Sequence, residues 1–209
     1  MKYEMTDIAR TVKLNDREVT VYRIRATEDF TVEAWNGLRV FPEEIHAGDL
    51  GGFIEHERNL SQTGSCWVSG EAVVLDEASV SEDAYVSGWP RCLITDHAKV
   101  YGKAKVCVAS RILDYAEVSG DAWLYGSTIV KDHAKIKDSA HICSTTIGGE
   151  VVVCDEAYID NYRPDISGND VIGGKTRLLF SVLEKWGLDE KGLMETPREK
   201  LFPKTASAI

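Results

Sequence analysis

Three things are scarce in this sequence: basic charge, long apolar runs and the common motifs of catalysis. Its 24 Lys and Arg are outnumbered by 34 Asp and Glu, and the formal net charge is −10. General nucleic-acid binding depends on neutralising phosphates with Lys and Arg, so nucleic acid is not an expected partner. No apolar run is long enough to cross a bilayer, and residues 1–10 lack the basic-then-apolar plan of a signal peptide. We therefore expect a cytoplasmic protein without a membrane partner.

Cysteine is also scarce, and its spacing argues against metal. The chain has five Cys and no Cys-x-x-Cys pair, so we expect no structural zinc and no other metal site. Cys66, Cys92 and Cys154 fall in or beside core positions of the repeat described below, where Cys behaves as a small apolar residue. The P-loop, nucleophile-elbow and zincin motifs are absent. The residues themselves predict no cofactor.

A six-residue period dominates what the sequence does have. A small residue recurs at every sixth position, and an aliphatic residue follows two positions after nearly every one of them. The small residues are Cys92, Ala98, Ala104, Ser110, Ala116, Ala122, Thr128, Ala134, Ala140 and Thr146. The aliphatic ones are Ile94, Val100, Val106, Ile112, Val118, Leu124, Val130, Ile136 and Ile142, and Gly148 breaks the last slot. A short fixed period of this kind is typical of a coiled, quasi-one-dimensional β-structure.

The period predicts the geometry of one turn. In a strand the small and aliphatic residues point inward and the residue between them points outward, so three units of eighteen residues close a triangle. Corners need residues that tolerate unusual backbone angles. The predicted corner residues are Gly70, Asp76, Asp83, Asp96, Gly102, Asp114, Gly120, Gly126, Asp132 and Asp138. Two extra residues near Trp89-Pro90 must bulge out, a one-residue deletion is expected at Gly148-Gly149, and about five turns result.

We divide the chain into three regions. Residues 1–62 alternate as β-strands do and predict a small N-terminal β cap. Residues 63–160 form the coil. Residues 161–209 are predicted to hold one α-helix near Lys175 to Trp186, whose apolar residues are spaced three and four apart. The expected class is thus all-β, a parallel β-helix with a cap and a C-terminal helix.

Side chains eighteen residues apart should form columns on the three faces. The first column is mostly aliphatic: Val73, Leu93, Arg111, Ile129 and Ile147. The second is mostly polar: Ser79, Lys99, Glu117, Lys135 and Val152. The third is mostly aromatic: Trp67, Tyr85, Lys105, Trp123, His141 and Tyr158. Exposed apolar strips mark contacts. We expect the C-terminal helix to cover the first column, and we leave the third to the cap, another subunit or a partner, as the candidate binding surface.

The segments around the first repeats carry a resemblance. They are Tyr22-Arg-Ile-Arg-Ala26, Ala47-Gly-Asp-Leu-Gly-Gly-Phe-Ile-Glu55, Glu57-Arg-Asn-Leu-Ser-Gln62 and Cys66-Trp-Val68. The chain resembles phage- and prophage-encoded bacterial proteins of the YdcK type, and its coil resembles the hexapeptide repeat of left-handed β-helices. The resemblance implies a left-handed coil in a bacterial host cell. It implies no established catalytic residue.

Two functions follow as hypotheses. The first is a non-catalytic, phage-derived interaction protein, expected as a homo-oligomer, that binds and blocks a host factor such as a defence component. The second is implied by the hexapeptide resemblance: an acyltransferase that uses acyl-CoA, with a histidine as general base in an active site between subunits. The candidate histidines are His141, His97 and His133, the last two in matched Asp-His-Ala-Lys strings that also fit a repeated corner. The coil lacks a long substrate loop, which favours the interaction protein.

One glycine pair has two possible roles. Gly51-Gly52 lies where the cap chain turns into the coil. It either allows close backbone approach or cradles an anion with its N–H groups, and we favour close approach.

Overall fold

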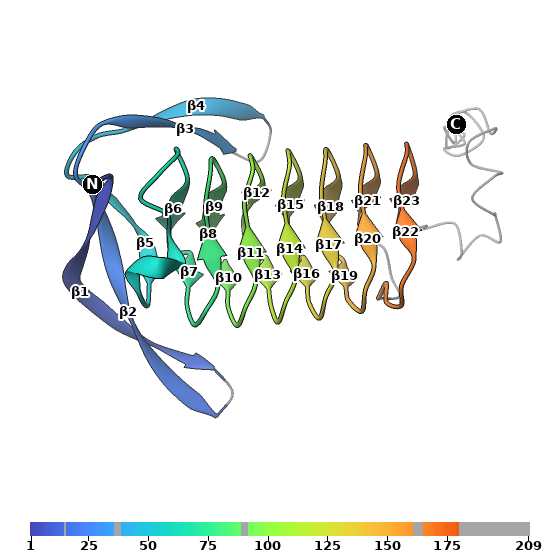
Figure 1. Cartoon of the computed structure of the whole chain (residues 1–209), viewed down its shortest axis with the longest axis horizontal. Coiled ribbons are helices and arrows are strands. Elements are labelled where there is room, and N and C mark those ends of the chain that lie inside the picture. The colour runs from blue at the N-terminus through green and yellow to red at the C-terminus, as the bar shows by residue number, and fades with distance from the viewer. Residues whose placement is uncertain (15, 36–38, 89–91, 161–164, 180–209) are drawn as a thin grey trace, which may run out of the picture. The chain divides into compact units, whose positions relative to one another are not determined.

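The computed structural model describes residues 1–14, 16–35, 39–88, 92–160 and 165–179. In this part of the chain the regular elements are β-strands and one short 3₁₀ helix, η1 (Glu57–Asn59). Successive turns stack in parallel as a β-solenoid with three faces, and Figure 1 shows the strands of each face repeating from turn to turn. The all-β class and the stacked parallel coil are therefore confirmed.

Each face is one sheet. Face one contains β7 (Val73–Val74), β10 (Leu93–Ile94), β13 (Arg111–Ile112), β16 (Ile129–Val130) and β19 (Thr146–Ile147). Face two contains β8 (Ser79–Val80), β11 (Lys99–Val100), β14 (Glu117–Val118), β17 (Lys135–Ile136), β20 (Val152–Val153) and β22 (Val171–Ile172). Face three contains β6 (Trp67–Gly70), β9 (Tyr85–Gly88), β12 (Lys105–Val106), β15 (Trp123–Tyr125), β18 (His141–Cys143), β21 (Tyr158–Asp160) and β23 (Arg177–Leu179).

The repeat forms the core as its chemistry requires. Small and aliphatic residues such as Ala98, Val100 and Ile112 are fully buried inside the coil. The second and third predicted columns have the predicted register: Lys99 pairs with Glu117, and Trp123 pairs with His141. Paired residues on adjacent turns are usually eighteen positions apart. Tyr85 and Lys105 are twenty apart, because the two-residue insertion predicted near Trp89-Pro90 lies between them.

The predicted position of the deletion is wrong. Ile129 pairs with Thr146, seventeen residues on, whereas Tyr125 still pairs with Cys143, eighteen on. The missing residue therefore lies between Cys143 and Thr146, before Gly148-Gly149. A shift of one residue moves a side chain to the opposite face of a strand. Thr146 thus belongs to the outward column of face one, and Ile147 is fully buried.

The coil is also longer than predicted. Face three has seven strands, where about five turns are expected. Arg177–Leu179, the start of the predicted helix, is strand β23 and pairs in parallel with β21. Ile166, Ile172 and Leu178 continue the six-residue period and pack against the core, which favours a strand over a helix there. The rest of that predicted helix lies outside the described residues.

The N-terminal region consists of two hairpins and a linking strand. β1 (Tyr3–Leu14) and β2 (Arg17–Ala26) pair antiparallel, and β2 pairs with β5 (Leu50–Ile54). β5 then pairs in parallel with β7, so the sheet of face one continues into the cap. β3 (Phe30–Trp35) and β4 (Val40–Ile45) form the second hairpin.

The first hairpin covers the start of face one, for which the sequence predicts a C-terminal helix; most of that predicted helix lies outside the described residues. Val12 and Val19 from the hairpin pack with Val73 and Leu93 in one apolar cluster. The cap-to-coil junction is tight, because a Cβ on Gly51 would come within 2.6 Å of Ile24 and Trp67 side-chain atoms. Gly51-Gly52 is buried and packed against backbone and side chains, which supports the structural account of the pair.

Nine of the ten predicted corner residues have positive φ. The exception is Asp83, because the corner there turns at Glu82 with φ 61°. Val108, with φ 63°, is a corner that no sequence rule for corners would choose.

Candidate functional site

The third column is the candidate binding surface, and its first three residues are covered. Trp67, Tyr85 and Lys105 are 1%, 5% and 4% exposed. The β3–β4 hairpin covers them: Phe30 contacts the Trp67 ring edge-to-face, at 5.3 Å between centroids. Tyr85 donates its hydroxyl hydrogen to the Glu43 carboxylate at 3.2 Å. The cap thus occupies this half of the face within the same chain.

Among the described residues, no hairpin or other element covers the other half of the column. Trp123, His141 and Tyr158 on β15, β18 and β21 are each partly exposed, and the exposed Arg177 on β23 continues the column. We call the face-three surface of these four strands the open half. Trp35, at the end of β3, contacts Tyr125 at 5.2 Å and marks the boundary with the covered half.

Two rings of the open half are stacked, and the Tyr158 ring is tilted against them. Trp123 and His141 are parallel within 5°, with centroids 4.8 Å apart. The His141 and Tyr158 centroids are 6.1 Å apart, and the Arg177 guanidinium lies over the Tyr158 ring at 5.5 Å. The Trp123 and His141 rings therefore each use one face inside the column. Face-on stacking of sugars or bases, which needs a free ring face, is disfavoured here.

The ring edges offer hydrogen-bond donors. Within the described residues, neither the Trp123 indole nitrogen nor the His141 ring nitrogens have a hydrogen-bond partner, and Arg177 has no carboxylate partner. The hydroxyls of Tyr125 and Tyr158 lie 3.3 Å apart. Burial lowers the pKa of His141, so the imidazole is neutral at pH 7.

Nucleophilic chemistry is not favoured at this surface. Burial raises the pKa of the neighbouring Cys143 thiol, which keeps it protonated and poorly nucleophilic. Burial also raises the pKa of Tyr125. The open half can bind through apolar area and N–H donors, while it lacks an activated nucleophile among its described residues.

His97 and His133 do not join His141. They lie at a corner of the coil, stacked above and below Tyr115 at 4.7 and 5.0 Å between ring centroids. Since Tyr115 separates them, they cannot share a metal ion. The aspartates that precede these rings bind backbone: the amide of Asp114 donates to Asp96, and that of Asp132 donates to Asp114. These contacts support the interpretation of the two matched Asp-His-Ala-Lys strings as a repeated structural corner.

One group of side chains could hold a metal ion. Asp138, Cys154 and Asp155 have ligand atoms within 4.8 Å of one another, in the part of the chain that the structure describes. Both carboxylates already accept backbone hydrogen bonds, from the amides of Asp155 and Gly174. A corner aspartate that accepts a backbone amide of the next turn recurs at other corners. This structural role accounts for the two carboxylates here.

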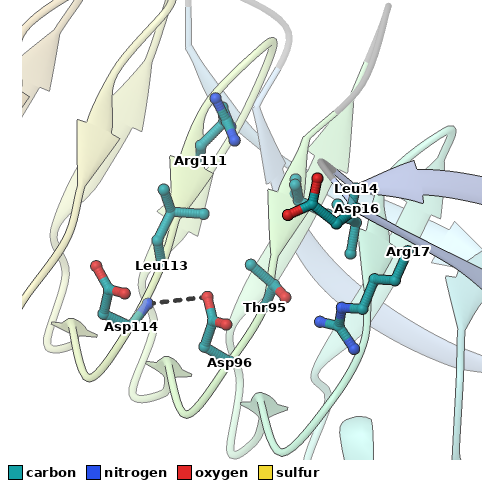
Figure 2. A pocket seen from close by; sticks show the side chains of 9 residues that line it. Leu14, Asp16, Arg17, Thr95, Asp96, Arg111, Leu113 and Asp114 are labelled. Carbon is teal, nitrogen blue, oxygen red and sulfur yellow. Dashed lines mark hydrogen bonds between the residues drawn. The ribbon is translucent and has the colours of Figure 1, made fainter.

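A groove that the sequence did not reveal lies between the tip of the β1–β2 hairpin and face one (Figure 2). Its volume is about 430 Å³. Leu14, Asp16 and Arg17 form one side, and residues of β10, β13 and the following corners form the other. Arg17 binds Asp76 through two hydrogen bonds, of 2.7 and 2.6 Å. The groove depends on where the hairpin lies, which no local pattern encodes.

Comparison with protein-family models finds no match to this chain. A search of curated proteins also finds no significant match. Among the described residues, no helix has the length and apolar character needed to span a bilayer.

Proposed function

We propose that this chain is a non-catalytic interaction protein that binds another protein through the open half of face three. The carrying observation is the division of the aromatic column: the cap covers Trp67, Tyr85 and Lys105 and leaves Trp123, His141 and Tyr158 accessible. Buried and half-buried aromatic residues with a polar edge are the groups enriched at protein interfaces.

The rigidity of the coil supports this proposal. In the open half β15, β18 and β21 each pair with a strand on both sides, so their outward side chains are organised before binding, which lowers the entropy lost on association. The aromatic stack also presents indole and imidazole edges, and these suit the acceptors of a protein surface.

We also propose a bacterial cell as the biological setting. The resemblance to phage- and prophage-encoded proteins of the YdcK type suggests a protein that blocks a host factor in a bacterial cell, with a left-handed coil as in hexapeptide proteins. Its net charge of −10 would favour a basic host partner by long-range attraction.

The experiment compares two variants in affinity purification from a bacterial host. We expect the Trp123→Ala, His141→Ala double variant to lose the partners that the wild type retains. Tyr115→Ala is the matched control, because Tyr115 is an aromatic residue 52% exposed at a corner away from face three. Retention of every partner by the double variant would refute the open half as the binding surface.

One observation supports acyl transfer as a second candidate. His141 has a lowered pKa and free ring edges, as a general base requires. Calorimetry with acetyl-CoA decides between the two: heat of binding that depends on His141 would support the enzyme, and no heat at millimolar ligand would exclude it.

A further inference from the structure

We infer that the open half binds a second copy of this chain, with the two coils side by side and antiparallel. The inference rests on the proposed function, because it names an occupant for the same surface. It comes from the distribution of charge over the four strands of the open half.

The open half is a grid of three columns and four rows, one row for each strand. The central column is Trp123, His141, Tyr158 and Arg177. One flanking column is Tyr125, Cys143, Asp160 and Leu179, which pair in register. The other, two residues before the central one, is Asp121, Ser139, Glu156 and Lys175, all exposed.

The two ends of this grid are complementary. The β15 row carries one charge, the carboxylate of Asp121, beside two aromatic rings. The β23 row carries two cations, Lys175 and Arg177, beside the exposed Leu179. Arg177 already contacts one ring of its own chain, so an aromatic environment suits its guanidinium.

A two-fold axis that lies in the interface, parallel to the strands and between β18 and β21, brings these ends together. It places Asp121 opposite Lys175 of the second copy, and Trp123 opposite its Arg177, as an ion pair and a cation–π contact. In the same register Tyr125 faces Leu179, and His141 faces Tyr158. Ser139 faces Glu156, and Cys143 faces Asp160, which pairs hydroxyl and thiol donors with carboxylates. No two like charges oppose each other.

The other face-to-face two-fold arrangement is unfavourable. An axis along the strand stack keeps each row opposite itself, so Arg177 would face Arg177, and Glu156 would face Asp160. Like-charge contacts at an interface oppose association. The charge pattern therefore selects the antiparallel dimer.

The size of the surface sets its strength. Four strands about 4.8 Å apart span roughly 15 Å along the stack. A surface of that length is smaller than the area of about 800 Å² per partner that a stable interface typically buries. Each copy also carries a net charge of −10. We expect a weak dimer, with Kd in the micromolar range or above, that forms best where salt screens the long-range repulsion.

Sedimentation velocity tests this with the full-length protein, over concentrations from about one to several hundred micromolar in about 0.15 M salt. Asp121→Lys and Lys175→Asp should each weaken the dimer by about tenfold, because each puts like charges opposite one another twice in the dimer. The double variant Asp121→Lys, Lys175→Asp should recover most of the wild-type affinity. Lys99→Asp on face two is the control and should leave the dimer unchanged, and circular dichroism checks folding.

A wild type that stays monomeric throughout would overturn the inference, as would a double variant no better than either single one. If the chain is monomeric and Trp123→Ala, His141→Ala still loses a host partner, the inference fails while the proposed function stands. If the charge exchange restores the dimer and no host partner depends on Trp123, the dimer stands and the foreign partner does not.

Discussion

At the scale of single residues, the corner aspartates connect one turn of the coil to the next. Asp114 adopts φ 55° and accepts the amide of Asp132 at 3.0 Å, while its own amide donates to Asp96 at 3.2 Å. Asp and Asn are the non-glycine residues that best tolerate this backbone region, and their side-chain oxygens reach the backbone of the next turn. The recurrence of Asp at corners thus has a local physical cause.

Substitutions of Asp114 should separate the contribution of its side-chain hydrogen bond from that of its negative charge. Asp114→Ala loses the acceptor and puts a Cβ residue without a local hydrogen bond at positive φ, so we expect about 2 kcal/mol lower free energy of unfolding. Asp114→Asn keeps the acceptor and removes a like charge between Asp96 and Asp132, so its stability should equal or exceed that of the wild type. Urea denaturation measures both; equal losses for Ala and Asn would contradict this account.

Val108 is a β-branched residue in the left-handed region, with φ 63° and 36% exposure. Val108→Asn should raise the free energy of unfolding by about 1 kcal/mol, because it relieves backbone strain and removes little packing. Val152→Asn, at a strand position outside the left-handed region, is the control and should bring no gain. If both variants lose stability equally, Val108 is not strained.

At the scale of elements, the β3–β4 hairpin attaches to the coil through a buried cation. The Lys105 side chain is 4% exposed, and its amine lies 3.2 Å from the Glu33 carboxylate and donates to the Lys103 carbonyl. Glu33→Gln leaves that cation without its counter-charge, so we expect a loss of about 1–2 kcal/mol, moderated because Glu33 is half exposed. Lys105→Met leaves only a solvated carboxylate and should cost less. Chemical denaturation compares the two, and a larger loss for Lys105→Met would contradict the account.

The β1–β2 hairpin attaches to the coil through Asp76. Burial alone would raise the pKa of this carboxyl, but hydrogen bonds from Arg17, Thr95 and the Asp96 amide lower it below its ordinary value. A lowered pKa in the folded state means that this stabilisation is present above the unfolded value of about 3.9, and is lost as pH falls through the folded pKa.

Asp76→Asn should therefore reduce stability near neutral pH and reduce the acid sensitivity of the protein. The measurement is the free energy of unfolding from pH 6 to pH 2 for the wild type and the variant, with the exposed Asp121→Asn as control. The two curves should converge at low pH. Parallel curves would show that Asp76 does not contribute through its charge.

At the scale of the whole molecule, the sequence predicts the coil far better than its coverings. The six-residue period determines which side chains stack, and it placed Trp123, His141 and Tyr158 in one column. It also continues through Ile166, Ile172 and Leu178, where the helical spacing of the C-terminal segment competes with it; the helix predicted there is wrong for Arg177–Leu179, which is strand β23. Short periods are local, so the sequence shows them directly.

The placement of the two hairpins could not be predicted in the same way. Contacts such as Lys105 with Glu33 join residues 72 positions apart, and alternation in a strand gives its two faces but not the surface it covers. The division of face three into a covered and an open half follows from that placement. The groove beside Arg17 does so too.

The central claim is that the open half is where this protein meets another chain, and photo-crosslinking tests it most directly. A benzoylphenylalanine at position 141 lies within the open half, and one at position 115 lies on an exposed corner away from it. We predict that position 141 gives several-fold more crosslinked product, with a second copy or with another protein, than position 115. Equal yields from the two positions, or no product from position 141, would contradict the claim.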